Sequence, residues 1–178
     1  MEGVARDAVG GVCATRSGRA NIRRHVRAGP LQVLDVGGGN GLDAIPFASQ
    51  GHAVTLVDFA DEMLAEAERN AEIAGVLDRV KTMRAEASSL PKLFPEPAFD
   101  VVLAHNLLQY VDDVDATVES LCRPLRPGGL ISIISVNRYS EAYRTAIRDL
   151  DLVEALSRLD APTTKAGFVP GDALHPRL

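Results

Sequence analysis

The sequence predicts an α/β domain with a mostly parallel, doubly wound sheet that carries helices on both faces. Three observations point to this class. Short apolar runs alternate with stretches whose apolar residues recur at helical spacing. The first apolar run passes directly into a glycine-rich loop that opens a helix. The chain has 178 residues, of which 46% are hydrophobic, and this is enough for one domain with a buried core.

Five strands are expected, and each is a short apolar run next to glycine, proline or charged residues. The runs are residues 31–36 (LQVLDV), 53–58 (AVTLVD), 79–84, 99–104 (FDVVLA) and 130–136 (LISIISV). Three prolines make residues 85–98 a loop, because proline lacks an N–H donor and fixes φ. An Arg-Pro-Gly-Gly turn at 126–129 leads into the fifth strand.

Four helices are expected between or after the strands. Residues 41–51 end at Gly51, and residues 61–75 begin with acids, carry an apolar face and end at Gly75. Apolar residues recur at helical spacing over 114–125, and residues 139–159 are amphipathic. Because no repeat or linker interrupts the chain before about residue 160, we expect one domain over 1–160 and a flexible tail over 161–178.

Composition excludes several classes of protein. Aromatic residues make up 4% and tryptophan is absent, so a stacking platform for single-stranded nucleic acid has little to build on. No apolar run reaches about 18 residues and the first residues do not resemble a signal peptide, so we expect a cytoplasmic protein without a membrane segment. The spacing of Cys13, Cys122 and the four histidines predicts no metal site.

Charge is uneven along the chain. The net charge is −5, yet residues 1–27 hold six arginines against two acids. This segment is either a solvated helix face or a contact for an anionic substrate or RNA phosphates.

The sharpest local feature is the loop that contains Gly37, Gly38, Gly39 and Gly41. Without Cβ atoms, its backbone N–H groups can approach a ligand closely. A dinucleotide fingerprint would place its third glycine where this chain has Leu42, and a phosphate-binding loop would need a Gly-Lys-Ser/Thr that is absent. The loop therefore predicts a ligand site but does not by itself identify the ligand.

Two carboxylates end the first two predicted strands. Asp58 follows Gly37 by 21 residues, where a carboxylate accepts both hydroxyls of a ribose, although it would also suit a helix cap. Asp35 lies under the loop, where it can accept bonds from the loop backbone or reach a ligand ammonium group.

Together these segments resemble the class I S-adenosylmethionine-dependent methyltransferases. The resemblance rests on VLDVGGGNG at 33–41, LVDF at 56–59 followed by DEML, and LRPGGL at 125–130. It is closest to the bacterial tRNA 5-carboxymethoxyuridine methyltransferase group, through GHAV at 51–54, RAEA at 84–87, AHNLLQY at 104–110 and TRSG at 15–18. The resemblance implies a Rossmann-like fold with strand order 3-2-1-4-5, which the family continues by two more strands that we do not expect in this chain.

The resemblance implies a set of site residues for S-adenosylmethionine and its product S-adenosylhomocysteine. Gly37 and Gly38 would lie against the methionine part, Asp58 on the ribose and Phe59 on the adenine. Arg23 would reach the cofactor carboxylate, and His105 would flank the transferable methyl as the catalytic candidate, acting as a base or ordering the loop beside the cofactor. The other implied cofactor-binding residues are Asp35, Gly39, Gly41, Met63, Glu86 and Ala87.

The main prediction is methyl transfer to a small molecule or an RNA such as tRNA. The alternatives are a methyltransferase-like protein that binds the cofactor without turnover, as a partner subunit or regulator, and an NAD(P)-dependent oxidoreductase. The missing strands would leave residues 130–136 as an open sheet edge. We expect a second copy of the chain, the rest of a longer protein or the chain's own tail or last helix to cover that edge.

Overall fold

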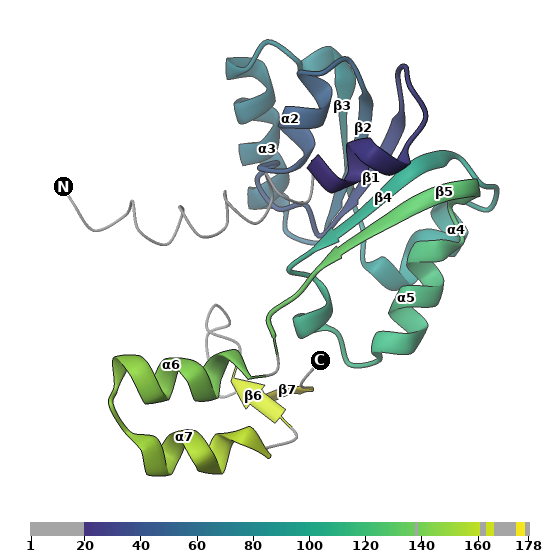
Figure 1. Ribbon diagram of the computed structural model, residues 1–178. Coiled ribbons are helices and arrows are strands. Elements are labelled where there is room, and N and C mark those ends of the chain that lie inside the picture. The colour runs from purple at the N-terminus through teal and green to yellow at the C-terminus, as the bar shows by residue number, and fades with distance from the viewer. Residues whose placement is uncertain (1–19, 138, 161–162, 166–173, 177–178) are drawn as a thin grey trace. The chain divides into compact units, whose positions relative to one another are not determined.

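The computed structural model describes residues 20–137, 139–160, 163–165 and 174–176 (Figure 1). The chain forms two compact units. The first comprises the described residues up to His105 together with Asp115–Ile134, and the second comprises Asn106–Val114 and the described residues from Ser135 onward.

The first unit contains one parallel sheet of five strands. They are β1 (Gln32–Val36), β2 (Ala53–Asp58), β3 (Val80–Arg84), β4 (Phe99–His105) and β5 (Leu125–Ile134). Their order is β3-β2-β1-β4-β5, and every neighbouring pair is parallel. The predicted fold class and strand order are therefore confirmed. The carboxyl ends of β1, β2 and β4 meet at one edge of the sheet, where a ligand site is expected.

Helices cover both faces of this sheet (Figure 1). On one side lie α2 (Ala44–Ala48) and α3 (Asp61–Ile73), and on the other lie α4 (Leu90–Leu93) and α5 (Val114–Cys122). Residues 20–25 are also helical. Short 3₁₀ turns, η1 (Leu77–Arg79) and η2 (Ala87–Ser89), flank β3.

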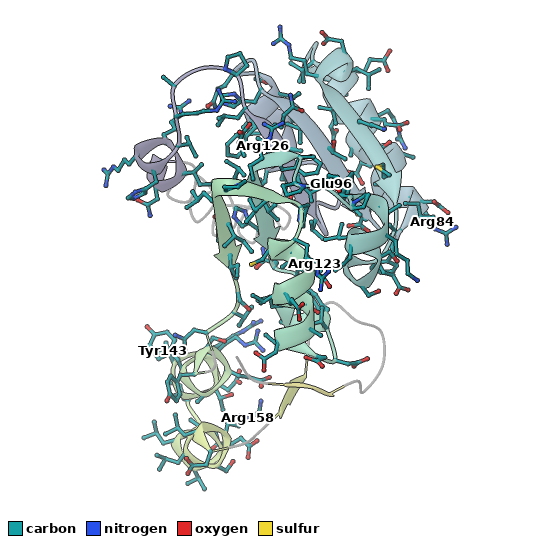
Figure 2. The ribbon with its side chains drawn as sticks, turned by 90° about the vertical axis from the view of Figure 1, so that its right-hand side faces the viewer. Arg84, Glu96, Arg123, Arg126, Tyr143 and Arg158 are labelled. Atoms are coloured by element: carbon teal, nitrogen blue, oxygen red, sulfur yellow. The ribbon has the colours of Figure 1, made fainter. Side chains whose placement is uncertain are left out.

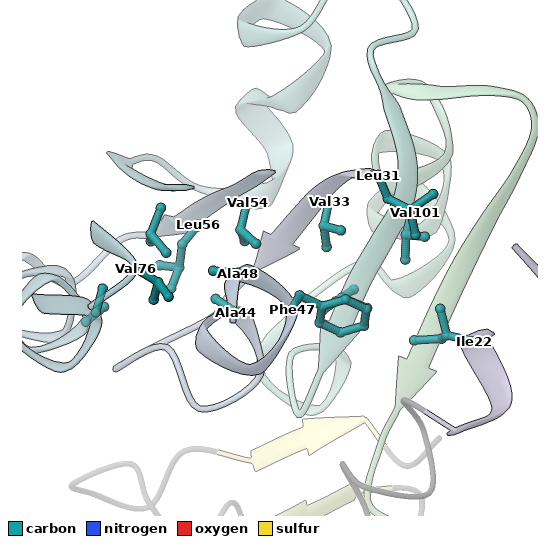
Figure 3. Packing of buried hydrophobic residues seen from close by; sticks show 14 of the residues in the cluster. Ile22, Leu31, Val33, Ala44, Phe47, Ala48, Val54, Leu56, Val76 and Val101 are labelled. Carbon is teal, nitrogen blue, oxygen red and sulfur yellow. The ribbon is translucent and has the colours of Figure 1, made fainter. Parts of the chain in front are cut away.

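The core lies between the sheet and α2 and α3 (Figure 3). Phe47 on α2 is buried among strand residues such as Val33 and Val101, and Ile22 closes one side. Leu34 and Val102 are fully buried as well, although they alternate with Val33 and Val101 along their strands. Strands buried on both faces explain why the sequence shows continuous apolar runs rather than alternation.

The helix expected over 41–51 is shorter than predicted. Only Ala44–Ala48 is helical, because Gly41 has φ +83° and still belongs to the loop. The expected turn at 126–129 is part of β5, where the register with β4 shifts between Phe99 and Val101.

The prediction of a single helix over 139–159 is also wrong in detail. The segment divides into α6 (Ser140–Arg148) and α7 (Leu152–Leu159), and Leu150 between them has φ +55°. The Asp151 side chain accepts the N–H of Glu154 and so caps α7. An Asp three residues before a Glu is a helix-start signal, and this one marks the division of the predicted helix.

The second unit holds η3 (Leu108–Tyr110), α6 and α7, and a two-stranded antiparallel sheet of β6 (Thr163–Lys165) and β7 (Leu174–Pro176). Arg158 on α7 contacts Glu141 on α6 at 3.3 Å and Glu154 at 2.8 Å (Figure 2). The predicted flexible tail, 161–178, lies mostly outside the described residues. The described parts of it are β6 and β7, which were not predicted.

Candidate functional site

The glycine loop follows β1 and turns tightly over the carboxyl end of the sheet. Gly37, Gly39 and Gly41 have φ values of +68°, +52° and +83°, a region that glycine adopts without strain. Gly38 is needed for a different reason, because a Cβ there would lie 2.8 Å from both Asp35 Oδ2 and Leu56 Cγ. The Gly37 N–H donates to the carbonyl of Val57 at 2.8 Å, which fixes the loop to the end of β2.

Asp58, at the end of β2, ties two segments of this edge together. Its Oδ2 accepts the N–H of Gly39 at 2.9 Å and its Oδ1 accepts the N–H of Ala60 at 3.0 Å. Ala60 directly precedes α3, so Asp58 holds the turn that leads into the helix, although it does not bond an N–H within the helix as a cap would. Since an ionised carboxylate offers about four acceptor positions, Asp58 can still accept the hydroxyls of a sugar.

Phe59 follows Asp58 and is 71% exposed, which is unusual for a phenylalanine in a domain with a well-formed core. Its carbonyl accepts a hydrogen bond from Arg84 Nε at 3.3 Å, and Arg84 also pairs with Asp61 at 3.2 Å (Figure 2). The backbone beside Phe59 is therefore held, while its ring stays available for stacking.

Asp35, at the end of β1, is buried and only partly satisfied. Burial is the main cause that raises its pKa to about 7, and the charges of Asp43 and Asp58 raise it further. His105 and the Ala44 N–H, which donates to Asp35, act in the opposite direction. Oδ2 of Asp35 has no hydrogen-bond partner among the described residues. A buried acceptor without a donor is costly, and here it lies directly beneath the glycine loop.

His105, at the end of β4, is 6% exposed and uses both ring nitrogens. Nδ1 lies 2.9 Å from Asp43 Oδ2, and Nε2 lies 2.9 Å from Ser132 Oγ on β5. Neither partner could be predicted from the sequence, because Asp43 has the position of a helix cap and Ser132 that of an ordinary strand residue. That His105 acts as a general base stays a prediction.

The remaining predicted residues fall into two groups. Met63 in the first turn of α3 is 39% exposed. Glu86 precedes η2 and Ala87 begins it, and the N–H of the preceding residue, Ala85, donates to the Asp58 carbonyl. Arg23 is not brought to this edge. Its guanidinium donates to the side chain of Gln50, which lies between α2 and the start of β2 at the opposite, amino-terminal edge of the sheet.

In the part of the chain that the structure describes, no group of three or more His, Cys, Asp or Glu side chains could hold a metal ion. None of its helices combines the length and the apolar character that crossing a membrane requires.

A parallel sheet with a glycine loop after its first strand and an acid at the end of its second defines a Rossmann-like, nucleotide-binding class of domain. Residues 33–129, more than half of the chain, match the family model described as methyltransferase domain. The chain belongs to this methyltransferase family, as the sequence motifs predict.

Curated relatives carry methyltransferase names. The tRNA 5-carboxymethoxyuridine methyltransferase of Escherichia coli (strain K12) is 36% identical over 109 residues, which cover 61% of this chain and 41% of the relative. The ubiquinone biosynthesis O-methyltransferase of Paramagnetospirillum magneticum is 37% identical over 117 residues, covering 66% and 45%. The chain thus spans less than half the length of these two relatives.

Solved structures agree on the fold. An S-adenosylmethionine-dependent methyltransferase from Geobacter sulfurreducens, in complex with S-adenosylhomocysteine, has a TM-score of 0.57 and 29% identity, covering 67% of this chain and 47% of its own. The [4+2]-cyclase SpnF has a TM-score of 0.60 and 26% identity, covering 85% and 59%.

Proposed function

We propose that this chain binds S-adenosylmethionine and forms the cofactor-binding part of a methyltransferase that acts on a small molecule or an RNA. The observation that carries the proposal is the pair of buried carboxylates, Asp35 and Asp58, on either side of the glycine loop. The family match and the similar structure that contains S-adenosylhomocysteine support the same ligand.

The residues present fit this cofactor. Asp35 offers an unpartnered buried oxygen for the ammonium group of the methionine part, and the absence of a side chain at Gly38 lets the loop backbone lie directly against it. Asp58 has spare acceptor positions for the two ribose hydroxyls. The exposed ring of Phe59 would stack on the adenine, with Met63 and Ala87 as further contacts.

When bound, the cofactor supplies a methyl group on a positively charged sulfur, which is already a strong electrophile. The chain's own residues then have to orient the ligand and exclude water rather than perform strong acid or base chemistry. Burial raises the pKa of Asp35 to about 7, and a cation bound beside this carboxyl would lower that pKa and so favour the ionised form.

A second candidate is cofactor binding without methyl transfer. The similarity to a structure named as a [4+2]-cyclase favours keeping it, because that name describes a reaction other than methylation. A fold alone does not determine the chemistry of its site.

Two experiments separate these candidates. Calorimetry tests which ligand the chain binds, and a methyl assay then tests whether it transfers the methyl group. We expect the full chain to bind S-adenosylmethionine and S-adenosylhomocysteine and not NAD. Binding of NAD alone would overturn the proposal in favour of an oxidoreductase. A radiolabelled methyl assay against total tRNA and against cell-extract metabolites then tests transfer. Binding without transfer to either pool would support the second candidate.

We also propose that a second copy of the chain covers the edge of β5. Within the described sheet β5 is an outer strand, and residues 130–134 carry no charge, whereas the other outer strand, β3, carries Lys81 and Arg84. Uncharged edges recruit other strands. Sedimentation at micromolar concentration should show a dimer, and a monomer with exchange-protected amides over 130–134 would rule it out.

We place the proposed activity in the cytoplasm, because S-adenosylmethionine and tRNA are both made in that compartment. Fluorescence microscopy of the tagged protein in its host would test this location, and signal confined to the cell envelope would contradict it.

A further inference from the structure

Asp43 does not do what its position suggests. It directly precedes α2, where an aspartate normally accepts an N–H of the first helical turn, yet its side chain makes no capping hydrogen bond. The N–H of Ala44 donates instead to Asp35, which reaches up from β1. Asp43 turns its carboxylate inward, and Oδ2 lies 2.9 Å from Nδ1 of His105.

The chemistry of this contact determines how His105 carries its proton. A carboxylate accepts hydrogen bonds, and with Asp43 as the acceptor Nδ1 of His105 is the donor. In the neutral imidazole Nε2 is then an acceptor, and the Ser132 hydroxyl, 2.9 Å away, is its donor. The assignment follows from the partners, and it leaves neither nitrogen available to a methyl acceptor.

The three side chains connect three separate elements. Asp43 lies two residues after Gly41, and the Gly41 carbonyl accepts the N–H of Ile45 in α2 at 3.0 Å, so the loop and the start of α2 are joined. His105 ends β4, and Ser132 lies on β5. The hydrogen-bonded series Asp43–His105–Ser132, called the relay below, therefore connects the segment after the glycine loop to the carboxyl ends of β4 and β5.

We propose that Asp43 and Ser132 are positioning residues of the cofactor site, which act by holding His105 in one orientation and tautomer and thereby holding the glycine loop in its binding geometry. The inference rests on the proposed function, because the effect is expected on cofactor affinity. It assigns His105 to ordering the loop rather than to accepting a proton from the substrate.

Two variants of Ser132 test the hydroxyl. Ser132→Ala removes the donor to Nε2, and Ser132→Thr keeps it on a side chain that suits a strand. Ser49→Ala is the matched control, because Ser49 follows the last residue of α2 and its hydroxyl donates to the Ile45 carbonyl in an exposed hydrogen bond. We expect Ser132→Ala to weaken S-adenosylhomocysteine binding about tenfold in calorimetry, the loss that one buried hydrogen bond implies. Ser132→Thr and Ser49→Ala should stay within about threefold of the unaltered chain.

A second measurement needs no cofactor. Long-range ¹⁵N–¹H correlation spectra of the unaltered, ligand-free chain show which ring nitrogen of His105 carries the proton, and we expect Nδ1. A proton on Nε2 alone would overturn the relay, even if the Ser132 variants failed to fold. If the unaltered chain bound no S-adenosylhomocysteine, the proposed function would fail, whereas the spectra would still decide the tautomer.

Three other results would also overturn the proposal. The first is Ser132→Ala binding S-adenosylhomocysteine as tightly as the unaltered chain. The second is Ser132→Thr losing as much affinity as Ser132→Ala, since the hydroxyl would then not be the important group. The third is a Ser132→Ala protein whose affinity is unchanged but whose kcat at saturating S-adenosylmethionine is lower, measured with the acceptor that the methyl assay identifies. The relay would then take part in removing a proton from the acceptor.

Discussion

Replacing Asp58 by alanine is the most informative single change, because this carboxylate has two roles that can be measured separately. In the ligand-free chain it accepts the N–H groups of Gly39 and Ala60 at 2.9 and 3.0 Å. Hydrogen bonds to a charged group contribute about 1.5–3 kcal/mol each, and water can enter the space left by alanine, so the lower end applies. We expect the free energy of unfolding to fall by about 3 kcal/mol, or Tm by roughly 6–12 °C.

The second role is ligand binding. Losing the proposed contacts to both ribose hydroxyls should weaken S-adenosylhomocysteine by about 30-fold to 1000-fold, equivalent to roughly 2–4 kcal/mol. Calorimetry should be run well below the Tm of the variant, so that only folded protein is titrated. Asp61→Ala is the control, because it removes a nearby exposed acid that pairs with Arg84 at 3.2 Å. A folded Asp58→Ala protein that binds within threefold of the unaltered chain would refute the ribose assignment.

Three further predictions concern the same unit. Gly38→Ala should lower the free energy of unfolding by about 1–3 kcal/mol and weaken S-adenosylhomocysteine at least tenfold, because its Cβ would meet buried atoms of Asp35 and Leu56 at 2.8 Å. At Gly39 φ is +52° and no atom lies within 4 Å of an added Cβ, so Gly39→Ala should cost only about 1–2 kcal/mol of backbone strain. If melting and calorimetry showed equal losses of stability and affinity for Gly38→Ala and Gly39→Ala, the steric argument would be contradicted. Asp35 has a folded pKa of about 7, chiefly through burial, against 3.8 for the free side chain, so its contribution to stability is complete below pH 4 and is lost as pH rises toward 7. Urea denaturation at pH 4.5 and 7 should therefore show Asp35→Asn gaining stability relative to the unaltered chain as pH rises, and a constant difference would refute the assignment. Burial raises the pKa of Asp100, but hydrogen bonds from one backbone N–H and two arginines outweigh it and lower the pKa overall, so its contribution is present above about pH 4 and is lost as pH falls through the lowered value. Asp100→Asn should thus be about 1–2 kcal/mol less stable at pH 7, with a difference that shrinks on acidification below pH 4; a difference that stays constant with pH would argue against it.

Local patterns were sufficient for the sheet. Residues 31–36, 53–58 and 99–104 could be predicted as strands because strands buried on both faces must be apolar throughout and end where glycine or a charge begins. The glycine loop was equally readable, since left-handed φ values select glycine. The motif order then pointed to the family, and residues 33–129 match its model.

Other features depended on distance along the chain. The partners of His105 lie 62 and 27 residues away, and only the parallel register of β4 with β5 and the path of the loop bring them to its two nitrogens. Arg23 lies at the amino-terminal edge with Gln50 for the same reason, since its place follows from packing rather than from a local motif. The sequence by itself determined the strands of the parallel sheet, the loop and the carboxylates at the strand ends, because these follow from backbone sterics and burial over a few residues. Only the tertiary structure decided which buried polar groups satisfy one another, because such pairs form between elements whose approach no local pattern encodes.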